Sequence, residues 1–239
     1  MKLSIVVPAF NEERLLPGAL QHIREGLAVC AQRGWRGEVI VCDNNSTDRT
    51  AEVARAAGAQ VVFEPVNQIA RARNAGAKAA SGDWLLFVDA DSSPSPRLFL
   101  DMLQAIETGR CVGGGATIAL PGAPLAARAW VGAWNVLSRT ARWAAGSFLF
   151  CEAAAFRAIG GFNEELYAAE EIDFSRRLKV RFPEQAFVIL HRHPLVTSGR
   201  KAELYTAREH LAFLWRMLTR GRRALRSRDA CSVWYDGRR

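Results

Sequence analysis

Residues 3–43 have the sequence LSIVVPAFNEERLLPGALQHIREGLAVCAQRGWRGEVIVCD, in which two apolar runs enclose a segment of helical spacing. The first run spans residues 3–7 and closes at Pro8, and the second spans residues 38–42 and ends at Asp43. Short apolar runs rich in β-branched residues are typical of parallel strands that are buried on both faces. Because residues 13–31 place Leu and Ile at helical spacing, the whole stretch predicts a β-α-β unit.

The same alternation continues as far as residue 91. The pattern predicts helices over 47–57 and 69–80, and strands over 60–63 and 84–88. This order of elements predicts an α/β fold with a doubly wound, mostly parallel sheet and helices on both faces. Ligands of such sheets bind at the carboxyl ends of the strands.

The alternation weakens after residue 91. We predict helices over 96–108 and 170–180, an amphipathic Trp-rich segment over 124–145, and strands over 112–120, 147–150 and 186–190. A long basic helix is expected over 203–228. The predicted organisation is one domain over 1–199, with halves at 1–91 and 92–199, followed by a basic helical tail over 200–239.

Length and composition exclude several classes of protein. The chain has 239 residues, of which 49% are hydrophobic and 23% charged, so it is long enough for a single large domain and is not disordered. It has neither a long uncharged apolar stretch nor a secretory leader pattern, so we expect a cytosolic protein without a transmembrane helix. The five cysteines form no CxxC pair and are expected to be reduced core residues. Residues 200–239 hold eleven Lys or Arg against four Asp or Glu, a net charge of +7 out of +8.

Carboxylates follow two of the predicted strands. Asp89-Ala90-Asp91 comes directly after the strand over 84–88, and Asp43 closes the strand over 38–42. Oxygen ligands placed in this way suit Mg²⁺ or Mn²⁺ shared with substrate phosphates, and Asp43 could accept hydrogen bonds from a base or ribose. Turn and cap chemistry is the alternative, because Asp, Asn and Ser favour both.

Two further groups of polar residues are candidates for binding or catalysis. Arg71, Arg73 and Asn74 could donate to a diphosphate, or could belong to an exposed basic helix face. The run 170–173, Glu-Glu-Ile-Asp, places three carboxylates within one helical turn. Crowded carboxylates raise one another's pKa, which suits a general base, but an acidic helix N-terminus is also a common structural feature.

Taken together, these residues resemble the family-2 glycosyltransferases of the GT-A fold. The matching pieces stand in the family's order and are IVVPAFNEE (5–13), VIVCDNNSTDRT (39–50), ARARNAGAKAASGDWLLFVDAD (70–91), GGFNEEL (160–166) and EEIDFSRRL (170–178). The resemblance implies transfer of a sugar from a nucleotide-sugar donor to an acceptor hydroxyl, usually with inversion, assisted by Mg²⁺ or Mn²⁺. It makes residues 1–91 the nucleotide-sugar half of the domain and residues 92–199 the acceptor half.

The resemblance also implies roles for individual residues. The base and ribose of the donor would be held by Pro8, Ala9, Phe10, Glu12 and Asp43. Other residues near the donor would be Arg71, Arg73, Asn74, Asp89 and Ala90. The metal ion would be bound by Asp91, with Asp89 assisting. The family often has Glu-Asp where this chain has Glu170-Glu171, so the catalytic base is open between Glu171 and Glu170.

Three further expectations concern the second half and the tail. Arg200 and Lys201 could close over the diphosphate from a loop, or could simply begin the basic tail. One of His191 and His193 could be a further metal ligand, or could make an ordinary polar contact. Trp and Arg residues interleave around Trp130 and Trp134 and again in the tail, which suggests a lipid-linked acceptor and a peripheral position on an anionic membrane.

Two other functions account for part of the pattern. A nucleotidyltransferase that makes the activated sugar would also use an α/β sheet and acidic metal ligands, but the N-terminal half lacks a basic Gly-rich loop for a triphosphate. A non-catalytic basic module would account for the tail but not for the acidic strand ends. No nucleic-acid partner is expected.

Overall fold

The structure is a computed structural model that describes residues 1–144, 146–198 and 225–231. Within them the strands, in chain order, are β1 (Lys2–Ala9), β2 (Arg36–Asp43), β3 (Gln60–Phe63), β4 (Trp84–Phe87), β5 (Ser92–Ser93), β6 (Cys111–Ala119), β7 (Leu149–Glu152) and β8 (Ala186–Thr197). The helices are α1 (Leu16–Gln32), α2 (Thr50–Ala56), α3 (Ile69–Ala79), α4 (Pro96–Glu107), α5 (Leu125–Ala141), α6 (Ala153–Ala158) and α7 (Glu170–Arg181), with a 3-10 turn η1 (Asp229–Cys231).

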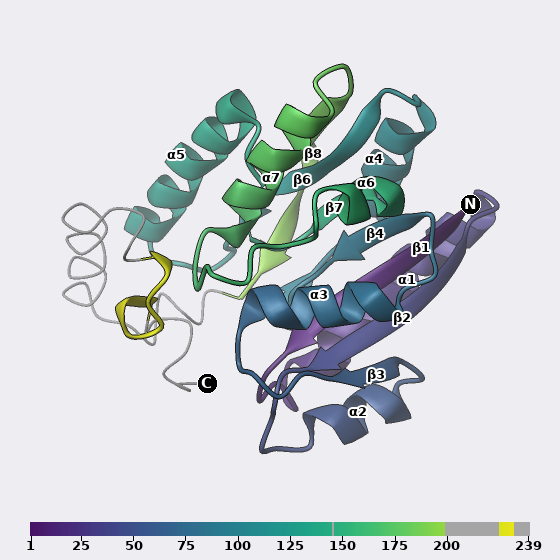
Figure 1. Ribbon diagram of the computed structural model, residues 1–239, viewed down its shortest axis with the longest axis vertical. Helices are drawn as coiled ribbons and strands as arrows, with labels where there is room; N and C mark the ends of the chain where they lie inside the picture. Colours follow the sequence, from purple (N-terminus) through teal and green to yellow (C-terminus); the bar gives the residue numbers. More distant parts are fainter. Residues whose placement is uncertain (145, 199–224, 232–239) are drawn as a thin grey trace.

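The strands form one sheet in the order β3-β2-β1-β4-β7-β6-β8-β5 (Figure 1). Strands β1 to β4 run parallel, as predicted, and β6 runs parallel to β8. Strand β7 lies antiparallel between β4 and β6. The α/β fold with a mostly parallel sheet is therefore confirmed, and the carboxyl ends of β1, β2 and β4 meet at one edge.

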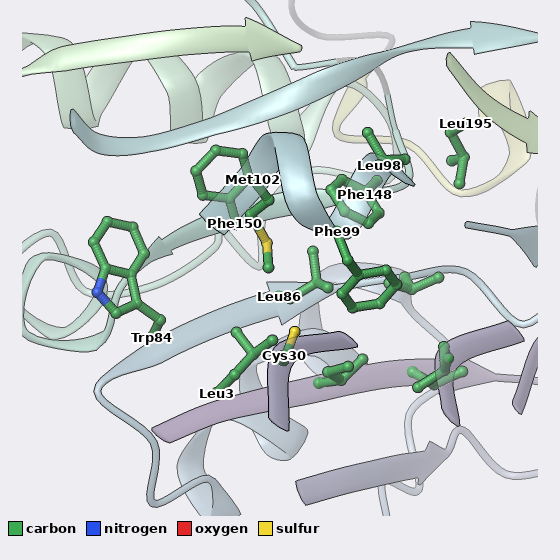
Figure 2. Close-up of a cluster of buried hydrophobic side chains, with 14 of the residues drawn as sticks. Leu3, Cys30, Trp84, Leu86, Leu98, Phe99, Met102, Phe148, Phe150 and Leu195 are labelled. Atoms are coloured by element: carbon green, nitrogen blue, oxygen red, sulfur yellow. The ribbon is translucent and has the colours of Figure 1, made fainter. Parts of the chain in front are cut away.

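Helices cover both faces of this sheet because alternate residues of its strands point in opposite directions. On one face, Leu86 packs with side chains of α1 and α4, and the rings of Phe99 and Phe148 meet edge to face at 5.6 Å (Figure 2). On the other face, Phe87 packs with side chains of α3, α6 and α7. Strand β4 is buried along its whole length for this reason, which explains its uninterrupted apolar sequence.

The sequence-based boundaries of the second half were less accurate. Strand β8 was expected to end at residue 190 but continues to Thr197. Its pairing with β6 jumps from Leu190 to Leu195, which leaves residues 191–194 as a bulge. The polar bulge and Pro194 interrupt the apolar pattern, so the last part of the strand could not be recognised locally.

The cysteines, the lengths of the helices and the end of the described chain bear on three expectations from the sequence. All five cysteines are buried thiols rather than disulfides. Among the described residues, no helix combines the length and the apolar character needed to cross a bilayer. Of the basic helix predicted over 203–228, the structure describes only residues 225–228, in which Leu225 is helical and the next three residues lead into η1.

Candidate active site

The loops after β1 and β2 are joined into one surface at the carboxyl edge of the sheet. Asn11 adopts a left-handed backbone conformation, with φ of 53°, and its side chain accepts a hydrogen bond from Thr47 N–H at 2.8 Å. Its own N–H donates to Ser46 Oγ at 3.0 Å, and Ser46 N–H donates to Asp43 at 3.0 Å. These bonds fix the two loops relative to each other.

The residues expected to hold the nucleotide lie on this surface. Strand pairing places Pro8 beside Cys42 and Ala9 beside Asp43. Phe10 follows directly and is half-buried, while the Glu12 side chain is buried. The structure thus brings the base and ribose candidates of the two strands together, although their contact with a donor stays a prediction.

Two buried amides that the sequence analysis missed connect this surface to the second half of the chain. Asn44 donates to the carbonyl of Val66 at 2.6 Å and accepts from the Gln68 N–H at 2.8 Å. The Gln68 side chain then donates to the carbonyls of Glu164 and Leu166 at 2.6 and 2.9 Å. Their partners are backbone groups that lie 20 or more residues away in the sequence, so the sequence shows only that Asn44 and Gln68 are polar loop residues.

Arg71 and Asn74 contact the loop over 160–166. Asn74 donates to the carbonyl of Phe162 and accepts from its N–H, each at 2.9 Å, and also donates to Glu164. Arg71 forms ion pairs with Glu64 and Glu164 at 3.3 and 3.1 Å. Both side chains therefore stabilise the GGFNEEL loop, and their predicted contact with a donor remains untested.

Arg73 is the centre of the site. Its guanidinium is 2% exposed and lies 3.0 Å from Glu170, 3.1 Å from Asp89 and 3.4 Å from Glu171. It also donates to the carbonyl of Gly146 at 3.1 Å. Helix α3 thus carries one buried cation that joins the first aspartate of the DAD sequence to the two glutamates at the start of α7.

The charges of this cluster do not balance, since one guanidinium faces three carboxylates. Burial disfavours the charged form of Arg73, but Asp89, Glu171 and Glu170 outweigh it and raise the pKa of the guanidinium. Burial, with the negative charge of Glu171, raises the pKa of Glu170 to about 8 despite the opposing effect of Arg73. Glu170 is therefore mostly protonated at neutral pH.

The two glutamates differ in access to the solvent. The Glu170 side chain is 3% exposed and held by Arg73, whereas the Glu171 side chain is 15% exposed. Glu171 Oε1 also lies near Gly146. A Cβ atom built on Gly146 would be 3.7 Å from this oxygen. A neutral, enclosed carboxyl is a poor proton acceptor, so the geometry favours Glu171 over Glu170 as a base.

The raised pKa of Glu170 predicts a pH dependence of stability. Between pH 4.5 and 8 the unfolded chain loses the Glu170 proton while the folded chain keeps it, so the free energy of unfolding falls as pH rises through this window. Glu170→Gln removes this ionisation and preserves the shape. We expect the variant to gain stability relative to the wild type between pH 5 and 8 in urea titrations without added metal. Parallel pH profiles of the two proteins would contradict the assignment.

Asp91 contacts Ser198, the residue that follows the end of β8. Ser198 Oγ donates to its carboxylate at 2.7 Å, and Ser198 N–H donates to its carbonyl at 3.3 Å. Pairing of β5 with β8 brings these distant segments together. Asp91 and Asp89 offer hard oxygen donors, which fit a divalent cation that takes its other ligands from phosphates and water. No group of three or more acidic, His or Cys side chains in the described ranges could hold a metal alone.

The remaining candidates lie elsewhere. His193 Nδ1 is 3.0 Å from Asp101 of α4, and His191 Nδ1 lies 3.4 Å from the carbonyl of Ile189 in its own strand. Polar contacts, the alternative to metal ligation, are thus what the structure shows for both histidines. Arg200 and Lys201 fall outside the described residues.

The end of the described chain packs beside the site. Leu225 accepts a hydrogen bond from Tyr167 N–H at 2.7 Å, and Cys231 is buried in an apolar cluster with Ala168. Arg226 forms an exposed ion pair with Glu165 at 3.0 Å. Residues 225–231 therefore contact the loop that leads into Glu170, whereas the sequence predicts that they belong to a basic tail.

Comparison with known proteins identifies the family of the chain. The model of the family described as glycosyl transferase family 2 matches residues 4–151. An uncharacterized glycosyltransferase of Mycobacterium tuberculosis is 41% identical over 91 residues, which are 38% of this chain and 37% of that protein. Dolichol-phosphate mannosyltransferase of Pyrococcus furiosus is 31% identical over 117 residues, covering 46% of this chain and 31% of that protein. The matched region is thus about a third of the length of these relatives.

Solved structures share the fold at low sequence identity. Residues 1–349 of Staphylococcus aureus TarS in complex with UDP-GlcNAc give a TM-score of 0.64 at 19% identity, covering 91% of this chain and 65% of that one. Glucosyl-3-phosphoglycerate synthase of M. tuberculosis, in complex with Mn²⁺, UDP and glucosyl-3-phosphoglycerate, gives 0.62 at 21% identity, covering 97% and 80%. With its sheet, its DAD sequence and a family match over more than half of its length, the chain belongs to glycosyl transferase family 2.

Proposed function

We propose that this chain transfers a sugar from a nucleoside-diphosphate sugar to an acceptor hydroxyl, with inversion at the sugar C1. The observation that carries the proposal is the Arg73 centre, which joins Asp89, at the carboxyl end of β4, to Glu171 on α7. The complexes of TarS with UDP-GlcNAc and of glucosyl-3-phosphoglycerate synthase with UDP support a uridine nucleotide as the first donor to test.

In this proposal each group has one task. Loops after β1 and β2 hold the base and ribose, with Asp43 accepting hydrogen bonds. Glu171 removes the proton of the acceptor hydroxyl. The hydroxyl oxygen forms the bond to C1 while the bond between C1 and the diphosphate breaks. Arg73 keeps Asp89 and Glu171 in place and limits their repulsion. A Mg²⁺ or Mn²⁺ on Asp91, assisted by Asp89, would neutralise the charge that develops on the leaving diphosphate.

A lipid-linked acceptor is the class we favour. The relatives named dolichol-phosphate mannosyltransferase and undecaprenyl-phosphate 4-deoxy-4-formamido-L-arabinose transferase support it. We further propose that the enzyme works at the cytoplasmic face of a membrane. The basic segment over 203–224, which contributes to this expectation, lies outside the described residues.

A donor panel tests the proposal. Nucleoside-diphosphate sugars are added with Mn²⁺, unfolding is followed by a thermal-shift assay, and stabilised combinations are assayed for release of the nucleoside diphosphate. At a hundredfold excess over Kd, the matching donor should raise Tm by about 5–10 °C. A panel in which no donor stabilises the protein or is consumed would contradict the proposed function.

Asp91→Ala tests the metal assignment. We expect this variant to fold but to lose the part of the donor-dependent Tm increase that requires Mn²⁺, because the ligand that fixes the cation is gone. Asp83→Ala is the matched control, since Asp83 is exposed at the opposite end of β4. Equal Mn²⁺-dependent increases in wild type and Asp91→Ala would show that Asp91 does not bind the metal.

A further inference from the structure

Helix α5 presents an apolar face to the solvent. Its exposed side is built from apolar residues at helical spacing, namely Leu125, Ala126, Ala129, Trp130, Ala133, Val136 and Leu137. Leu125, Trp130 and Val136 are 80%, 65% and 62% exposed. We call this set the outer face of α5. In Figure 1 the helix lies at the periphery of the molecule beside α7.

The uncharged polar side chains Asn135, Ser138 and Thr140 of α5 are directed inward or form hydrogen bonds within the helix. Asn135 exchanges two hydrogen bonds with the backbone of Ile118 in β6, at 3.0 and 2.9 Å. Ser138 is buried and donates to the carbonyl of Trp143 at 2.6 Å. Thr140, on the exposed side, donates its hydroxyl back to Val136 and Leu137 carbonyls at 3.0 Å. This is the reverse of an ordinary surface helix, which turns its apolar stripe inward.

The charged side chains in the stretch of sequence that contains α5 are all positive. No Asp or Glu occurs between Glu107 and Glu152. Arg128 and Arg139 are exposed and stand eleven residues apart, so they lie on the same side of the helix, along one border of the outer face. An apolar face with Trp and a border of Arg matches the chemistry of a bilayer interface that contains anionic lipid.

We propose that the outer face of α5 docks the enzyme on an anionic membrane, with the helix lying in the plane of the interface. This inference rests on the proposed transfer to a lipid-linked acceptor and names the surface that would meet the lipid. This proposal differs from the expectation for the basic C-terminal segment, because it depends only on residues of α5, all of which the structure describes.

The position of α5 relative to the Arg73 centre explains how docking would serve the reaction. Lys179 of α7 donates to the carbonyl of Ala141 at 2.7 Å, which fastens the end of α5 to the helix that carries Glu171. Five residues after Ala141, Gly146 accepts the hydrogen bond from Arg73. A bilayer held against α5 would therefore present an acceptor headgroup on the side of the molecule where the catalytic glutamates lie.

Vesicle co-sedimentation of the full chain tests the inference. The probes are vesicles of phosphatidylcholine alone and of phosphatidylcholine with phosphatidylglycerol, at low and high salt. We expect the wild type to pellet with the anionic vesicles at low salt. Trp130→Gln with Val136→Gln should reduce the bound fraction at least tenfold, and Arg128→Gln with Arg139→Gln should lower affinity for anionic vesicles roughly 10- to 30-fold.

The matched controls are Val180→Gln, which changes an exposed apolar residue of α7, and Arg36→Gln, which removes an exposed cation of β2. Both should bind like the wild type. Wild type that stays in the supernatant, or α5 variants that pellet like the wild type, would overturn the inference. So would a wild-type dimer that Trp130→Gln converts to a monomer, without vesicle binding. Because donor stabilisation is measured without lipid, each of these results would leave the proposed transfer to be judged by the donor panel.

Discussion

Glu171→Gln should lower the turnover number by about 10²–10⁴-fold while donor affinity changes little. Gln keeps the length and shape of the side chain but cannot accept the acceptor proton. The residue is the more exposed of the two glutamates at the start of α7 and lies 3.4 Å from the Arg73 guanidinium, so its replacement should leave the fold intact. The measurement is the rate of nucleoside-diphosphate release at saturating donor and acceptor, with donor affinity from calorimetry.

Two other variants in the same helix show whether the effect is specific. Asp173 pairs with Arg177 at 2.6 Å in a partly exposed ion pair, so Asp173→Asn should keep turnover within a few-fold of the wild type. Glu170→Gln should also retain more activity than Glu171→Gln, because Glu170 is already mostly protonated at neutral pH. If Glu170→Gln were inactive and Glu171→Gln active, the base assignment would be wrong by one residue.

Arg73→Met should destabilise the protein by about 3–5 kcal/mol, because it leaves the Asp89 and Glu171 carboxylates without their cation and the buried Glu170 side chain without its hydrogen-bond donor. The free energy of unfolding is measured by urea denaturation at pH 7. Arg71→Met is the matched control from the same helix. Arg71 is 37% exposed and its partner Glu164 is 43% exposed, so we expect a change within about 1 kcal/mol.

A double variant separates lost charge balance from lost packing. Arg73 also lies over the Phe162 ring, with its guanidinium carbon 5.2 Å from the ring centroid, so some stability depends on packing alone. Adding Glu171→Gln to Arg73→Met removes one of the uncompensated carboxylates and should recover part of the loss. Strictly additive effects of the two changes would show that Arg73 stabilises the fold by packing and not through its charge.

The first half of the fold was predictable because its signals are local. Strand β4 is buried and apolar throughout, and β2 is apolar where it is buried. Asp43 ends β2 and Asp89 follows β4, and both mark the edge of the sheet where ligands bind. Expected and observed elements therefore agree closely up to Asp91. The bulged strand β8 and the two-residue strand β5 depend on pairing between distant segments, and neither has a periodicity of its own.

The site was predictable as a set of residues but not as a network. In the sequence, Arg73, Asp89, Glu170 and Glu171 are separate candidates, and only the resemblance to a family connects them. The role of Arg73 as a single buried cation among three carboxylates depends on α3 and α7 meeting in space. The packing of residues 225–231 near the start of α7 is likewise a long-range contact, so these residues could not be distinguished from a basic tail.

Diffraction at the manganese absorption edge, from crystals grown with Mn²⁺ and a nucleoside diphosphate, tests the central claim most directly. We predict an anomalous peak about 2.1 Å from an Asp91 carboxylate oxygen, bridged to the diphosphate, with the nucleoside on the loops after β1 and β2. Nucleotide density and a manganese peak away from the carboxyl ends of β1, β2 and β4 would contradict this account of the site.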